Sequence, residues 1–143
     1  QNARAEAVAA IRHDAAFEAY GYDIDPEAIA LTEENCRKAG VQPRIHLMQR
    51  DIADFEPIEH AITICNPPYG ERLSEQDELA AFYPQLGSAL KRNFSGWNCY
   101  LLTADLRMPK LMRLTPSKKT PLYNGAIECR LFEFKMVAGS NRR

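Results

Sequence analysis

The sequence predicts an α/β fold, in which a mostly parallel sheet is covered by helices on both faces and ends in an antiparallel C-terminal hairpin. Two observations carry this prediction. Along most of the 143 residues, short apolar runs alternate with longer helical patterns, as is typical of parallel sheets. Residues 128–136 instead alternate polar and apolar side chains, which indicates a strand with one wetter face.

The first part of the chain predicts a helix, a strand and a second helix. Residues 3–12 have a helix-favouring composition, and residues 19–24 are a short β-prone run. Asp25 can cap the following helix and Pro26 suits its first position, while Gly40 is placed just past its end. The strand therefore leads directly into a helix.

The rest of the chain repeats this alternation. Strands are expected at residues 44–48, 61–65 and 98–103, a long helix at 76–93, and a short helical connection at 106–112.

The ending predicts a hairpin at the edge of the sheet. Asn124-Gly125 is a strong turn signal directly before the alternating run 128–136. We expect the partner strand near residues 112–118.

Composition limits the class of protein. The chain is 45% hydrophobic and 26% charged with a formal net charge of −1, which suits one globular domain. Its apolar runs are far shorter than the roughly 20 residues of a membrane span, so we expect no membrane partner. The four widely spaced cysteines suit buried free thiols in a reducing cytoplasm, so we expect a cytoplasmic protein. The four cysteines and three histidines lack metal-ligand spacing, so no metal is expected. Because nucleic-acid binders usually carry a basic excess, any RNA affinity should be local or come from another domain.

The sharpest chemical feature is the turn Asn66-Pro67-Pro68-Tyr69, directly after an apolar strand. Ligands of open α/β sheets bind at the carboxyl ends of strands, and two prolines fix a stiff, extended turn there. The side-chain carbonyl of Asn66 and the backbone carbonyl of Pro67 can accept both hydrogens of an exocyclic amino group, while Tyr69 stacks on its base. A plain Asn-Pro turn is the alternative. We expect all four residues to be catalytic.

A longer run around the turn carries a family resemblance. Residues 66–73 read NPPYGERL and residues 124–129 read NGAIEC. Over residues 22–137 the chain resembles the bacterial 23S rRNA guanine-N2 methyltransferases, a THUMP-associated family once labelled N6-adenine-specific DNA methylases. The resemblance implies a Rossmann-like class I methyltransferase that uses S-adenosyl-L-methionine (SAM) to methylate an exocyclic amino group, in the first place guanine N2 of 23S rRNA. N6-adenine methylation of DNA or RNA, or a non-catalytic fragment with this fold, remains open.

The same resemblance implies a cofactor site. Asp23 would accept the ribose hydroxyls of SAM and Ile24 would lie against its adenine, while Asp51 would bind the adenine amino group and Ile52 would pack on the ring. Asn66 would also border the cofactor. Helix capping is the alternative role for Asp23, and a solvated loop position is the alternative for Asp51.

One part of the family pattern is not found in the sequence. These enzymes place a glycine-rich loop after their first strand, and nothing before Asp23 resembles it, since Gly21 is the first glycine. We therefore expect residues 1–143 to be the C-terminal part of a longer protein. Its first strand, its glycine-rich loop and a THUMP-like RNA-binding domain would precede residue 1, and the isolated fragment would lack full activity.

Overall fold

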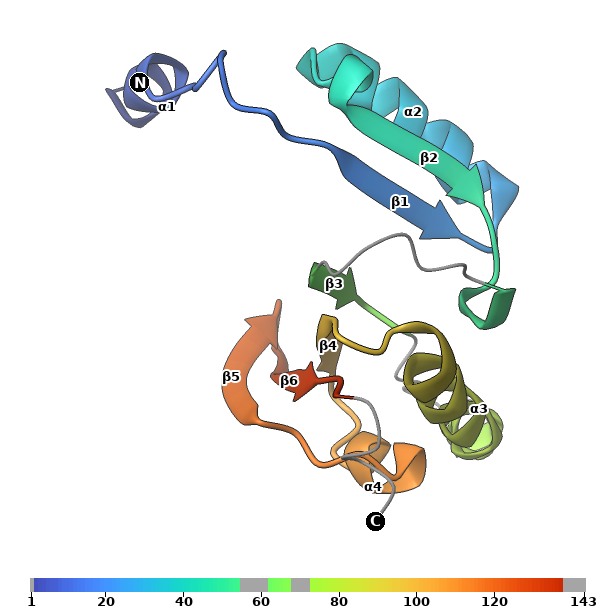
Figure 1. Cartoon of the computed structure of the whole chain (residues 1–143). Helices are drawn as coiled ribbons and strands as arrows, with labels where there is room; N and C mark the ends of the chain where they lie inside the picture. Colours follow the sequence, from blue (N-terminus) through green and yellow to red (C-terminus); the bar gives the residue numbers. More distant parts are fainter. Residues whose placement is uncertain (1, 55–61, 68–72, 138–143) are drawn as a thin grey trace. The chain divides into compact units, whose positions relative to one another are not determined.

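The computed structural model describes residues 2–54, 62–67 and 73–137 (Figure 1). The chain divides into two compact units, residues 1–51 and residues 52–143. Within the described ranges, no helix combines the length and apolar character that crossing a membrane requires.

The first unit is a pair of parallel strands with a helix beside them (Figure 1). The register of β1 and β2 runs from Ala19 opposite Ile45 to Asp23 opposite Gln49. A helix joins the two strands, as parallel pairing requires a crossover connection. The elements are α1 (Asn2–Ala9), β1 (Ala19–Asp23), α2 (Pro26–Ala39), the 3₁₀ helix η1 (Gln42–Arg44) and β2 (Ile45–Gln49).

The ends of α2 confirm the predicted capping residues. The side chain of Asp25 accepts the N–H of Glu27 at 2.9 Å, Pro26 lies in the first turn, and Gly40 ends the helix with φ 74°. Helix α1 is shorter than predicted. None of its residues is buried, so no tertiary packing extends it.

The second unit contains a four-stranded mixed sheet in the order β3-β4-β6-β5. Strands β3 and β4 are parallel, whereas β6 is antiparallel to both of its neighbours. The α/β class, the parallel pairing and the C-terminal antiparallel hairpin are thus confirmed. The elements are η2 (Ile52–Asp54), β3 (Ile62–Cys65), α3 (Leu73–Asn93), β4 (Asn98–Thr103), α4 (Met108–Met112), β5 (Lys118–Asn124) and β6 (Ile127–Lys135).

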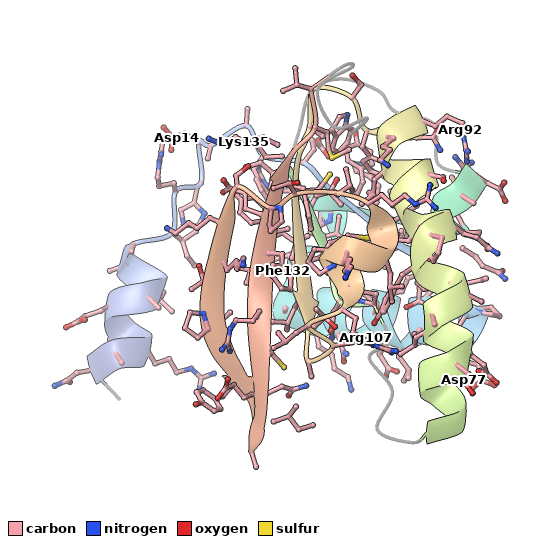
Figure 2. All side chains as sticks on the ribbon, turned by 90° about the horizontal axis from the view of Figure 1, so that it is seen from below. Asp14, Asp77, Arg92, Arg107, Phe132 and Lys135 are labelled. Atoms are coloured by element: carbon pink, nitrogen blue, oxygen red, sulfur yellow. The ribbon has the colours of Figure 1, made fainter. Side chains whose placement is uncertain are left out.

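The core of the second unit joins one face of β4 and β6 to α3 and α4. Cys99, Leu101 and Thr103 alternate along β4 and are fully buried, so one face of this strand carries the core. On β6, Phe134 is opposite Cys99 and Phe132 is opposite Leu101, and both phenylalanines are buried too. Phe132 is labelled in Figure 2. The remaining core members are Leu79, Tyr83, Leu86, Leu90, Phe94, Trp97, Met108, Met112, Leu114 and Met136.

The partner of the last strand differs from the expected one. Residues 112–118 are wrong as the partner, because β6 pairs with Lys118–Asn124. Met112 instead ends α4 and is buried in the core. Pro121 lies within β5, and a proline in a sequence usually speaks against a strand because it cannot donate a backbone hydrogen bond. It is tolerated here because β5 is an edge strand. The predicted turn at Asn124-Gly125 is confirmed, with Gly125 at φ 63°.

Helices α3 and α4 approach each other closely at Gly87. A Cβ added there would lie 2.3 Å from the backbone oxygen of Met112. Gly87→Ala is therefore expected to lower the free energy of unfolding by about 1–3 kcal/mol, because overpacking outweighs the better helix propensity of alanine. Urea denaturation measures this. The control is Ser88→Ala, the next residue along and exposed, which should change stability by less than about 0.5 kcal/mol. Equal effects would contradict the close approach.

Candidate functional site

The carboxyl ends of β3 and β4 lie at one edge of the four-stranded sheet. The two strands are parallel, with Cys65 opposite Leu101 at the end of the pairing. Asn66 and Pro67 follow β3 at once; Asn66 is exposed and Pro67 is buried. The turn thus begins at the sheet edge where ligands of α/β proteins bind.

In this position the exposed side chain of Asn66 is accessible to a ligand, while the buried Pro67 fixes the backbone. Proline fixes its own φ and restricts the residue before it, so burial of Pro67 holds Asn66 in a defined position. Pro68 and Tyr69 lie outside the described residues. The catalytic roles of all four stay predictions.

A hydrogen-bonded loop follows β4 at the same edge. The hydroxyl of Thr103 accepts the N–H of Asp105 at 2.9 Å and also hydrogen-bonds the buried Tyr83 of α3. Arg107, which is labelled in Figure 2, donates from Nε and Nη2 to the two carboxylate oxygens of Asp105, at 2.9 and 2.8 Å. Such a bidentate pair fixes both side chains. The sequence reading missed this loop, although Thr-x-Asp-x-Arg directly after a buried strand is a visible signal.

The charges of this loop are mutually stabilised. Hydrogen bonding from Arg107 holds the pKa of Asp105 below its usual value, and Asp105 in turn raises the pKa of Arg107. Burial raises the pKa of Tyr83. At neutral pH the loop therefore carries a closed ion pair, and Tyr83 of α3 beside it is a neutral phenol. This arrangement suits a rigid support better than a proton-transfer group.

The thiol of Cys99 is not a nucleophile under these conditions. It is fully buried on β4, and burial raises its pKa to about 12. The reactive form of cysteine is the thiolate, so covalent chemistry through this residue is excluded near neutral pH.

In the first unit, two of the predicted acids come together. Asp23 ends β1, and its backbone carbonyl accepts the N–H of Arg50 at 2.9 Å, so Asp51 follows directly beside it. Both side chains are exposed. Oδ1 of Asp23 also accepts the N–H of Asp25 at 2.9 Å. Asp25 itself caps α2, which leaves the carboxylate of Asp23 at the strand end without a capping role of its own.

The two predicted isoleucines have different surroundings. Ile24 is 65% exposed beside Asp23, and its carbonyl accepts a hydrogen bond from Gln49 Nε2 at 3.1 Å. Ile52 belongs to the second unit, where its partly buried side chain packs against the hydrophobic core. The structure thus groups Ile24 with the two acids of the first unit and Ile52 with the core of the second. Their contacts to adenine stay predictions.

The residues at the ends of β1 and β2 fit a nucleoside. Exposed carboxylates can accept hydrogen bonds from ribose hydroxyls or from an amino group, and the exposed side chain of Ile24 offers an apolar contact for a ring. Within the described part of the chain, no group of three or more His, Cys, Asp or Glu side chains is placed to hold a metal ion.

These features define a class of protein. The chain has parallel strands joined by a helix, an acid at the end of β1, a second acid after β2 and an Asn-Pro turn after β3. This is the arrangement of a Rossmann-like methyltransferase fold. The family of RMKL-like methyltransferase domains matches residues 1–133, and the chain belongs to this family.

Curated relatives and solved structures agree with this assignment. The ribosomal RNA large subunit methyltransferase K/L of Methylococcus capsulatus is 41% identical over 118 residues, which cover 82% of this chain. SMU.472, solved in complex with SAH, superposes with a TM-score of 0.83 at 27% identity, covering 94% of this chain and 36% of that one. A possible methylase from Clostridium difficile 630 has the same TM-score at 33% identity, covering 99% and 37%.

The matched relatives are much longer than this chain. The match to the Methylococcus protein spans 16% of that protein's length. The activity, substrates and partners of a whole protein are therefore matters for proposal.

Proposed function

We propose that this chain belongs to an enzyme that transfers the methyl group of SAM to the N2 amino group of guanine in large-subunit rRNA. The observation that carries the proposal is the position of Asn66 and Pro67, one exposed and the other buried, directly at the carboxyl end of β3. The curated relatives of this chain include ribosomal RNA large subunit methyltransferases K/L, which supports the rRNA substrate.

The cofactor would be held by residues of the family pattern. Asp23 would accept the ribose hydroxyls and Asp51 the adenine amino group, with Ile24 and Ile52 against the ring. The SAH in the related SMU.472 structure supports this choice of cofactor. When bound, SAM supplies a methyl group on a sulfonium, which is already an excellent leaving group.

The task of the protein's own residues is to prepare a weak nucleophile. The lone pair of an aryl amine is conjugated with the ring, so the amine must be held in a geometry that frees it. The side-chain oxygen of Asn66 accepts one amine hydrogen and the carbonyl of Pro67 accepts the other. The nitrogen is thereby aligned with the methyl group, so positioning and electrostatics supply the catalysis.

No strong base would be needed. The methyl group would pass to the amine nitrogen with S-adenosylhomocysteine as the neutral leaving group, and the methylated amine would give its proton to water. Tyr69 would stack on the target base, which must be extruded from its helix to reach the turn. Pro68 would stiffen the turn between them.

Recognition of RNA would depend mainly on other parts of the intact protein. The net charge of −1 supplies little general attraction to phosphate. A THUMP-like domain elsewhere in the gene product would bind the 23S rRNA, and the protein would act in the cytoplasm. N6-adenine methylation is the second candidate, because the same two acceptors fit that amine.

The cofactor site is tested by one side-chain change. Asp23→Asn keeps an oxygen that can accept the Asp25 N–H, but replaces the second acceptor and removes the charge. We expect the Kd for S-adenosylhomocysteine to rise by about 10-fold or more, since hydrogen bonds to charged groups contribute about 1.5–3 kcal/mol. Isothermal calorimetry on the intact gene product measures this.

The control makes the same chemical change two residues away. Asp25→Asn should leave affinity within about twofold, because asparagine caps helices as well as aspartate does. Equal weakening by both variants would contradict the ribose assignment. Absence of binding by the unmodified protein would contradict the methyltransferase proposal itself.

A further inference from the structure

The β5–β6 hairpin reaches past the end of β4. The last pair between β4 and β6 is Thr103 with Arg130, whereas β6 begins at Ile127 and pairs there with Asn124 of β5. Because β6 is antiparallel to β4, these extra residues extend beyond the carboxyl end of β4 by roughly 10 Å. The turn at Asn66 begins at this same edge of the same sheet.

An exposed aromatic ring lies near the tip of this hairpin. Tyr123 is 68% exposed, so core packing does not explain it. It is opposite Glu128 on β6, and directly opposite residues share one face of a sheet. Arg130, two residues further along, lies on that face too, as does its partner Thr103.

A chain of polar contacts restrains the ring. The hydroxyl of Tyr123 donates to Oε1 of Glu128 at 3.2 Å, and Oε2 of Glu128 pairs with Nη1 of Arg130 at 2.8 Å. Arg130 also donates to the carbonyl of Cys129 at 3.1 Å. Hydrogen bonds from Arg130 and Tyr123 hold the pKa of Glu128 below its usual value, so the carboxylate stays charged at neutral pH. The ring is thus held at its polar end while its faces remain available.

The chemistry of such a ring suits an unpaired nucleobase. A base that is not in a helix stacks on aromatic side chains, and each such contact contributes about 1–3 kcal/mol. When the target base of an RNA leaves its stack, the nucleotides next to it also lose a stacking partner and can contact the protein. The hairpin tip lies on the edge where those neighbours would pass.

We propose that Tyr123 is a stacking residue for an unpaired RNA base adjacent to the methylated nucleotide, with Glu128 and Arg130 as its positioning residues. This inference rests on the proposed RNA methylation and deepens it, because it assigns a second contact for the substrate outside the catalytic turn. The ring binds and orients RNA and takes no part in methyl transfer itself.

The test compares substitutions at one position in the intact gene product. Tyr123→Ala is expected to raise the KM for the RNA substrate by about 5- to 100-fold, the range that the loss of one stacked base implies. The kcat and the Kd for S-adenosylhomocysteine should change by less than about twofold. Tyr123→Phe retains the ring and should stay within about threefold of the unmodified KM. The matched control is Leu122→Ala, a half-exposed neighbour on the opposite face of β5, which should leave the KM unchanged.

A modified substrate makes the test specific for stacking. An RNA with an abasic residue beside the target guanine, placed on one side and then on the other, should raise the KM of the unmodified protein for one of the two positions. The same RNA should give Tyr123→Ala little further loss. A Tyr123→Ala variant with unchanged KM, or equal losses for the alanine and phenylalanine variants, would overturn the stacking role while leaving the proposed function intact. Absence of methyl transfer to any RNA by the unmodified protein would overturn both.

Discussion

Asn66→Ala is expected to lower kcat for methyl transfer by about 100- to 1,000-fold, the usual effect of removing one well-placed polar group that acts on the transition state. Under the proposed function, the variant would lose the side-chain oxygen that accepts one amine hydrogen, and the lone pair would no longer be aligned with the methyl group. Asn66 is exposed, and the fold should not change. Single-turnover transfer of labelled methyl to rRNA, measured on the intact gene product, gives the rate.

Binding of the cofactor separates this role from a structural one. The Kd for S-adenosylhomocysteine should stay within about twofold in Asn66→Ala, since the lost contact is to the substrate amine. Asn66→Asp retains an acceptor oxygen and should keep more activity than the alanine variant. Parallel loss of transfer and cofactor binding would show that the turn is structural.

Phe134→Ala is expected to lower the free energy of unfolding of the second unit by about 3–5 kcal/mol, as is usual for removal of a buried phenylalanine. Phe134 is fully buried on β6, opposite Cys99 of β4. Its removal would leave a cavity between the sheet and the helices of this unit. Urea denaturation followed by the fluorescence of Trp97, which lies in the same core, measures the loss.

An exposed residue of similar character is the control. Leu106→Ala removes an apolar side chain that is 62% exposed in the loop after β4, and should change stability by less than about 0.5 kcal/mol. A Phe134→Ala variant as stable as Leu106→Ala would contradict the core described here.

Local signals predicted much of the fold. The bounds of β4 agree with the predicted strand at 98–103, because a buried apolar run has clear polar ends. The capping residues of α2 could also be predicted, because helix caps depend on residues next to the helix in the sequence. The strand that pairs with β6 was predicted wrongly, because strand pairing depends on more than local sequence and because Pro121 makes an edge strand look like a loop.

The positions of candidate site residues could be predicted only where the sequence next to a strand indicates them. Asn66 and Pro67 follow β3, Asp23 ends β1, and Asp51 follows β2 by two residues, at the strand ends that the sequence indicates. Thr103 and Asp105 carry a local sequence signal, but their contact with Tyr83 could not be predicted, because it requires α3 and the loop after β4 to meet. Burial of Ile52 against the core depends on tertiary packing in the same way.

The most direct test of the central claim is the identity of the methylated nucleoside. The intact gene product would be incubated with SAM carrying an isotopically labelled methyl group and with unmethylated 23S rRNA, and the RNA digested and analysed by mass spectrometry. We predict label in N2-methylguanosine, which should form at least about 100-fold more slowly after Asn66→Ala. Label found only in N6-methyladenosine, or no label in RNA at all, would contradict the account.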